Sequence, residues 1–423
     1  MKYTIKKFNF ISNFVLCFFI AGVINTAEAY TLDELMQFSV NNRDAIKIRK
    51  GNIEKSESNV TVARSFFIPD LNAAYEAERD IDLSDEASTF TVSSQLNLFA
   101  GFRDYNNLAA EKKSKEISEL QLKSAKQNLQ LAVAIGFTDV FRNIERLRVA
   151  ESTLALFTDR YEIVKLKFET GLLTRRDMLA VKVEADNADQ VVRKAEASVV
   201  KSLNRLSRIT GLDGLLKEHL DFTVLGKLPK KEVYNDLEAK LMANRSELNI
   251  RKGIKDVNLN LYKAKKSEYY PRLNLSASYS KEDASSYDPW DAHEDWTAQL
   301  AVSMNLFDGL KTAAGLKSRK QDVSNAHHEL KELEKIFKTE LTNIVLDFEV
   351  AEKNLKAADS GMDEAEENVR TTELAFSQGR ATTTDGLNSI DSLVRAKLNV
   401  INARIELIVT DFRIKRMVED FIY

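Results

Sequence analysis

The chain has 423 residues, of which 61 are Lys or Arg and 64 are Asp or Glu, so its formal net charge is −3. This balance lacks the basic surplus that nucleic-acid binding requires, and we expect no nucleic-acid partner. The single cysteine, Cys17, excludes a fold that disulfides hold together.

The first 29 residues have the features of a secretory signal peptide. A basic start, an apolar segment and a small-residue cleavage site follow one another: Lys2, Lys6 and Lys7, then residues 14–24, then Ala27-Glu28-Ala29. The apolar segment is shorter than the roughly 20 residues of a membrane-spanning helix. No apolar run of that length follows it. We therefore expect cleavage after Ala29 and an exported, cysteine-free mature chain.

Two segments in each half of the chain alternate apolar and polar residues with the period of a β-strand, at 71–78, 89–98, 273–279 and 296–306. Each is roughly 9–11 residues long, which is the length of a transmembrane strand. One face is apolar and the other carries Ser, Thr, Asn and Gln, as in strands between lipid and water. The predicted lipid-facing residues of the second half are Leu273, Leu275, Tyr279, Trp296, Leu300 and Val302. The alternative is an ordinary amphipathic sheet on a soluble core.

Long segments without proline follow each strand pair and predict helices over 104–170, 175–208, 311–377 and 384–419. Their apolar residues recur at intervals of three and four, which indicates a coiled-coil seam. A helix of 67 residues is about 100 Å long. Such helices must pack against one another, because no globular core has that length.

Each long helix is expected to end at a glycine, Gly171 or Gly379, because glycine tolerates the left-handed conformation that stops a helix. Thr174-x-x-Asp177 and Thr382-x-x-Asp385 follow, and each is typical of an N-cap with an acid at the third helical position. The simplest role of both aspartates is therefore capping.

The two halves are copies of one unit. Asn42-Arg43 and Ile48-Arg49-Lys50-Gly51 recur 202 residues later, and Asn97-Leu98-Phe99-x-Gly101 recurs 208 residues later. We expect a first repeat at 30–210, a linker at 211–232 and a second repeat at 233–423. Because four strands are too few for a transmembrane barrel, several copies of the chain must contribute strands to one barrel.

The duplicated strand starts Pro69-x-Leu71 and Pro271-x-Leu273, the Asn-Leu-Phe-x-Gly strand ends and the glycine turns make the chain resemble the TolC-type outer membrane efflux protein family. The resemblance covers about 30–420. It implies an α+β fold in which each repeat is a β-hairpin with long coiled-coil helices. A homotrimer would then form a 12-stranded β-barrel in the outer membrane of a Gram-negative bacterium, above a periplasmic α-helical barrel.

The same resemblance implies the function and the partners. The chain would be an exit duct that receives substrates from a periplasmic adaptor protein and an inner-membrane ABC or proton-driven transporter. Type I protein secretion and small-molecule efflux both remain open. The alternative from another class is a non-conducting coiled-coil envelope protein or a trimeric adhesin.

The resemblance also suggests roles for residues of the turns. Asp385 would line the periplasmic gate as a ring of three, and Asn388 stands where related channels often carry another acid, which weakens the expectation of cation selectivity. The candidate adaptor-docking residues at the two turns are Gly171, Leu172, Thr174, Asp177, Gly379, Arg380 and Thr382.

No motif indicates an enzyme, a catalytic residue, a cofactor or a metal site. His327 and His328 are adjacent on an expected helix, and they lack the spacing of four residues that lets two helical histidines share a metal.

Overall fold

The structure, a computed structural model, describes residues 29–80, 85–229, 236–283 and 293–421. Residues 1–28 of the expected signal peptide and residues 230–232 of the expected linker lie outside these ranges. Two helices, a strand pair and a long helix pair follow one another, and the same order then repeats. The bounds are Leu32–Asn42 (α1), Asp44–Ser65 (α2), Asp70–Asp80 (β1), Asp85–Ala100 (β2), Arg103–Glu169 (α3), Arg175–Thr210 (α4), Leu237–Asn244 (α5), Ser246–Lys266 (α6), Arg272–Asp283 (β3), His293–Ser303 (β4), Lys311–Ser377 (α7) and Thr383–Val418 (α8).

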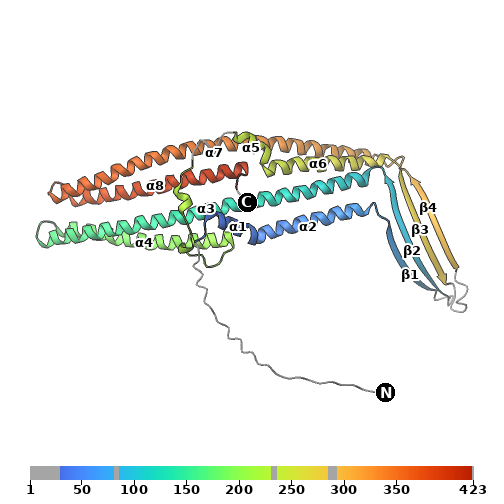
Figure 1. Cartoon of the computed structure of the whole chain (residues 1–423), viewed down its shortest axis with the longest axis horizontal. Helices are drawn as coiled ribbons and strands as arrows, with labels where there is room; N and C mark the ends of the chain where they lie inside the picture. The colour runs from blue at the N-terminus through green and yellow to red at the C-terminus, as the bar shows by residue number, and fades with distance from the viewer. Residues whose placement is uncertain (1–28, 81–84, 230–235, 284–292, 422–423) are drawn as a thin grey trace, which may run out of the picture.

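The molecule is long and thin (Figure 1). The four strands lie at one end, the α3–α4 and α7–α8 turns lie at the other, and α3 and α7 run between them. Both long helices have 67 residues, which corresponds to about 100 Å. The four long helices begin and end within two residues of the predicted positions, so those predictions are confirmed. Of the described helices, none combines the length and the apolar composition that a membrane span requires.

The strands form one antiparallel sheet in the order β1-β2-β3-β4, so the two repeats meet at the β2–β3 pair. The sheet forms because alternating residues of paired strands fall on the same face. The expectation that the last strand continues to Leu306 is wrong. β4 ends at Ser303, opposite Arg272 where β3 begins, and beyond this point β3 offers no backbone partner.

Each repeat turns from strand to long helix through two successive left-handed residues. These are Gly101 and Phe102 in the first repeat and Gly309 and Leu310 in the second. The surroundings of the two glycines differ. A β-carbon on Gly101 would lie 2.6 Å from the backbone oxygen of Ser267 and 2.8 Å from Cβ of Tyr270, whereas one on Gly309 would meet nothing within 4 Å.

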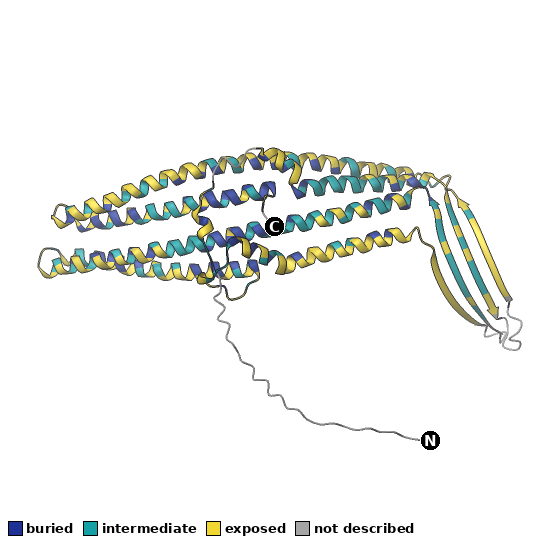
Figure 2. Cartoon of the chain, viewed as in Figure 1, coloured by how far each residue is buried: buried dark blue, intermediate teal, exposed yellow. Residues whose placement is uncertain are grey.

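The largest hydrophobic core lies midway along the helices, where α1 and the linker pack against α3, α4 and α8 (Figure 2). Phe137, Leu206 and Leu35 are fully buried there. A second core joins α5 and α6 to α7 and α8. Toward the turns the helices are covered on fewer sides, and the buried clusters are small. The middle of the molecule is therefore the part that burial stabilises most.

Candidate functional site

The predicted lipid-facing residues of the second repeat share one face of the β3–β4 pair. Leu273 lies opposite Val302, Leu275 opposite Leu300 and Tyr279 opposite Trp296. The rings of Tyr279 and Trp296 are 4.8 Å apart. Polar pairs occupy the intervening register positions, with Ser276 opposite Gln299 and Ser278 opposite Thr297. One face of the sheet is thus apolar and the other is polar.

No helix of the described chain covers the apolar face of β4. Trp296, Leu300 and Val302 are 79, 60 and 71 % exposed, and the sheet stands clear of the helices (Figure 2). Contiguous exposed apolar side chains of this kind indicate contact with lipid or with a partner. A polar opposite face is what a water-filled lumen requires.

The outer strands β1 and β4 each leave one edge of backbone N–H and C=O groups without a partner strand in this sheet. Lipid offers no hydrogen bonds to such an edge, so an edge at membrane depth must pair with another strand. Exposed apolar side chains flank both edges. Phe66, Phe67 and Ile68 precede β1, and Leu306, Phe307 and Leu310 follow β4.

The helix turns at the far end are built as predicted. Gly171 and Gly379 have φ of +77° and +71°, and each lies just after the end of a long helix. In the return helices Thr174 and Thr382 are the N-caps, and both form complete capping boxes with the acid three residues on. Asp385 Oδ2 accepts hydrogen bonds from the Thr382 hydroxyl at 2.7 Å and the Thr382 backbone N–H at 2.8 Å. The capping interpretation is confirmed for both aspartates.

The capping hydrogen bonds also lower the pKa of both acids. Hydrogen bonds from the side chain and then the backbone of Thr382 hold the pKa of Asp385 below its usual value. Thr174 lowers the pKa of Asp177 in the same way. Both carboxylates are therefore anionic at neutral pH. Beside them Leu172 is 73 % exposed and Arg380 is exposed, so the predicted docking residues form an uncovered tip.

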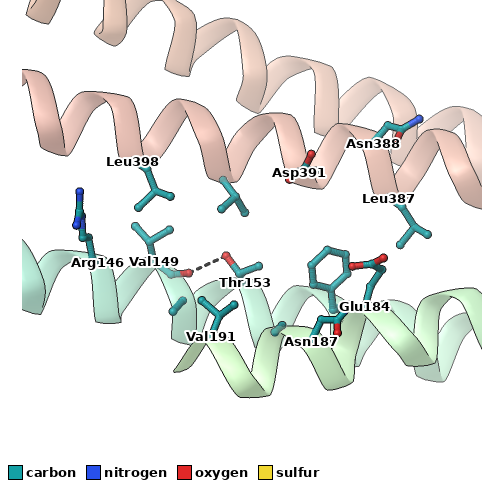
Figure 3. Close-up of a pocket in the computed structure, with 14 residues that line it drawn as sticks. Arg146, Val149, Thr153, Glu184, Asn187, Val191, Leu387, Asn388, Asp391 and Leu398 are labelled. Atoms are coloured by element: carbon teal, nitrogen blue, oxygen red, sulfur yellow. Dashed lines mark hydrogen bonds between the residues drawn. The ribbon is translucent and has the colours of Figure 1, made fainter. Parts of the chain in front are cut away.

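A cavity of about 400 Å³ lies between the α3–α4 hairpin and α8, along residues 387–398 of α8 (Figure 3). Val149, Val191, Leu387 and Leu398 contribute apolar walls, and Asn388 lies at its margin. On the other side of α8, Asn388 and Asp385 line a groove between α7 and α8. The two predicted gate residues thus share the groove between α7 and α8, and Asn388 also lines the cavity. Within the described residues, no group of three or more His, Cys, Asp or Glu side chains is arranged to hold a metal.

Sequence reasoning missed Arg160, which is 4 % exposed and reaches from α3 to the second repeat. The available signal was its position. Arg160 follows Phe157 by three residues and precedes Val164 by four, so a charged residue stands within the apolar stripe of α3.

Comparison with known proteins assigns the chain to a family. The family model described as "Outer membrane efflux protein" matches residues 35–212 and 250–417, which is most of the chain and includes both repeats. The chain belongs to the outer membrane efflux protein family. The match decides in favour of the channel over the non-conducting envelope protein or adhesin. This efflux protein therefore lies in the outer membrane and serves as an exit duct.

Individual relatives agree with the family match. The efflux protein is 22 % identical over 401 residues to the outer membrane efflux protein BepC of Brucella suis, across 93 % of this chain and 87 % of BepC. Its fold is similar to that of a membrane protein from Pseudomonas aeruginosa, with a TM-score of 0.82, 16 % identity and coverage of 92 and 90 %. It is also similar to the outer membrane protein VceC of Vibrio cholerae, with a TM-score of 0.80, 14 % identity and coverage of 92 and 95 %.

Proposed function

We propose that three copies of the chain form one export duct: their sheets join into a twelve-stranded barrel, and their long helices form a periplasmic tunnel. Each copy supplies four strands with two unpaired edges. Joining β4 of one copy to β1 of the next removes every open edge, which a membrane environment demands. The number three comes from the resemblance to TolC-type channels.

The contact between the two repeats of one chain suggests which residues meet where β4 of one copy joins β1 of the next, a boundary that we call the seam. Gly101 packs against Ser267 and Tyr270 where the first repeat meets the second. The counterparts of these three residues are Gly309, Ser65 and Ile68. Gly309 faces open space in a single copy, and Ile68 is 64 % exposed. A neighbouring copy that repeats the internal contact would bring its Ile68 against Gly309 and cover the apolar residues at both edges.

Cysteine pairing tests the seam, because the mature chain has no cysteine of its own. The double variant Ile68→Cys, Gly309→Cys should form covalent trimers on oxidation, visible on denaturing gels without reductant. The matched control, Ile68→Cys with Gly315→Cys, places the second thiol within α7, after the turn from strand to helix, and should leave monomers. Monomers from both variants would contradict this seam.

We further propose that the turn residues 171–174 and 379–382 dock on a periplasmic adaptor, which links the duct to an inner-membrane ABC or proton-driven transporter. The support is the exposed tip at the end farthest from the sheet (Figure 1). Leu172→Cys carrying a photo-crosslinker should yield one discrete adduct in cells, whereas Val200→Cys, which is 56 % exposed on α4, should not. Equal labelling from both positions would contradict docking at the turns.

Conduction tests the proposed function as a whole. The purified mature protein should run as a heat-modifiable trimer from the outer-membrane fraction and should conduct ions in a planar bilayer. A soluble monomer without conductance would overturn the proposal.

A further inference from the structure

Arg160 of α3 reaches across to the second repeat close to the turns. Its guanidinium carbon lies 4.0 Å from the ring centroid of Phe376, which is in the last turn of α7. A β-carbon built on Gly386, in the first turn of α8, would overlap this same guanidinium. Gly386 therefore forms a socket that any larger residue would close. One side chain of the first repeat thus contacts both helices of the second hairpin.

Lys167 strengthens the contact one heptad further along α3. Its Nζ lies 4.1 Å from the centroid of the Phe376 ring and donates a hydrogen bond to the Phe376 backbone oxygen at 3.4 Å. Two cations on one face of α3 thus hold the same aromatic ring. Partly desolvated contacts between a cation and an aromatic ring are attractive.

These residues do not belong to the duplicated framework. The second-repeat counterparts of Arg160 and Lys167 are Asn368 and Ala375, and the first-repeat counterpart of Gly386 is Met178. Only the phenylalanine is present in both copies, as Phe168 and Phe376. The contact therefore runs from α3 to the α7–α8 turn, and the duplicated residues cannot repeat it from α7 to the α3–α4 turn.

The buried guanidinium is held by shape more than by hydrogen bonds. Among the described residues, Nε and Nη2 of Arg160 have no hydrogen-bond partner, and neither has the hydroxyl of Thr383. Burial lowers the pKa of Arg160, and the charge of Glu373 opposes that shift. Unpaired buried N–H groups are costly, and this cost offsets part of the attraction to the ring. The position of the guanidinium therefore depends on the space above Gly386 and on the Phe376 ring.

We propose that Arg160 is a positioning residue that holds the first turn of α8, and with it Asp385, against α3 through the Gly386 socket. The inference deepens the proposed export function, since it rests on the α8 turn lying at the periplasmic entrance of the duct. Loss of the contact frees the second hairpin to move away from the first.

Unfolding temperatures test the contact at Gly386 without any assumption about transport, because Gly386→Ala should change them in opposite directions with and without Arg160. In the wild-type background Gly386→Ala should lower the unfolding temperature, because the methyl group displaces the guanidinium. In an Arg160→Ala background the same change should raise it, because alanine favours a helix over glycine once the space is empty. An effect of the same sign in both backgrounds would overturn the proposal.

Channel recordings test the positioning role. Arg160→Ala and Gly386→Ala should each raise single-channel conductance, and the double variant should match Arg160→Ala. The control Arg370→Ala removes an exposed arginine of α7 that pairs with Glu367, and it should conduct like the wild type. If the wild type conducts and Arg160→Ala conducts identically, the positioning role is wrong. If the wild type does not conduct, the export function fails, while the stability test still decides the socket.

Discussion

The carboxylate of Glu419, just beyond the end of α8, accepts hydrogen bonds from both the backbone N–H and the hydroxyl of Ser246 at 2.7 and 2.8 Å. Lys123 Nζ of α3 lies 2.9 Å from the same carboxylate. The Glu419 side chain is fully buried, so this group joins the end of α8, the start of α6 and the first third of α3. In the first repeat Gly211 ends α4 at the corresponding left-handed position, so this link belongs to the second repeat alone.

Removing this carboxylate should destabilise the protein strongly. Glu419→Ala removes the carboxylate that Lys123 and Ser246 contact and leaves the buried Arg416 with Glu247 as its remaining anionic partner. Breaking a buried ion pair in this way costs about 3–5 kcal/mol. Chemical unfolding in detergent, followed by the loss of helical circular dichroism, measures the change. Glu151→Ala, at an exposed site on α3, should unfold like the wild type. A loss below about 1 kcal/mol for Glu419→Ala would show that the buried link is weak.

The same region should make stability fall in acid. Burial opposes the ionisation of Glu247, but the charges of Arg245 and Arg416 outweigh it and hold the pKa of Glu247 below its usual value. A lowered folded-state pKa adds stability that is fully present above the unfolded value, about pH 4.3, and is lost as the pH falls through the folded pKa. The unfolding temperature should therefore drop below about pH 4.3, and Glu247→Gln should reduce that drop. Parallel curves for the variant and the wild type would assign the acid sensitivity to other groups.

Asp385 and Asp177 are a matched pair for separating gating from capping. Both acids cap a return helix through the same hydrogen bonds to threonine, so each alanine variant should lose about 0.3–1 kcal/mol of helix stability. Only Asp385→Ala should raise single-channel conductance, because only Asp385 is proposed to line the entrance. Conductance that rises equally in both variants, or in neither, would leave Asp385 with the capping role alone.

Neighbouring residues of β4 test which face of the sheet meets lipid. Leu300 belongs to the exposed apolar face, and Gln299 belongs to the polar face, where it lies opposite Ser276. Leu300→Lys should reduce the amount of trimer in the outer membrane, since a lysine facing lipid near the midplane costs about 2–4 kcal/mol. Gln299→Lys should assemble normally and shift ion selectivity toward anions. Normal assembly of Leu300→Lys would place lipid elsewhere.

Features that depend on neighbours in the chain could be predicted from the sequence. Thr382 and Asp385 are three residues apart, so their capping box, the glycine stop before it and the helix after it follow from local geometry. Alternation from Leu273 to Val302 predicted which residues share a face of the sheet, because side chains of a strand alternate between its two faces. The end of β4 was placed too late because strand length depends on a partner, and β3 begins only at Arg272.

The sequence by itself determined the duplication, the long helices, the turns and the two faces of the strands, because each follows from a period or a cap within a few residues. Only the tertiary structure decided that Arg160 of the first repeat meets Phe376 and Gly386 of the second, and that Glu419 meets Ser246. Those contacts depend on how long helices lie against one another. Packing between distant segments selects a partner by shape and charge, and it leaves no period in the chain.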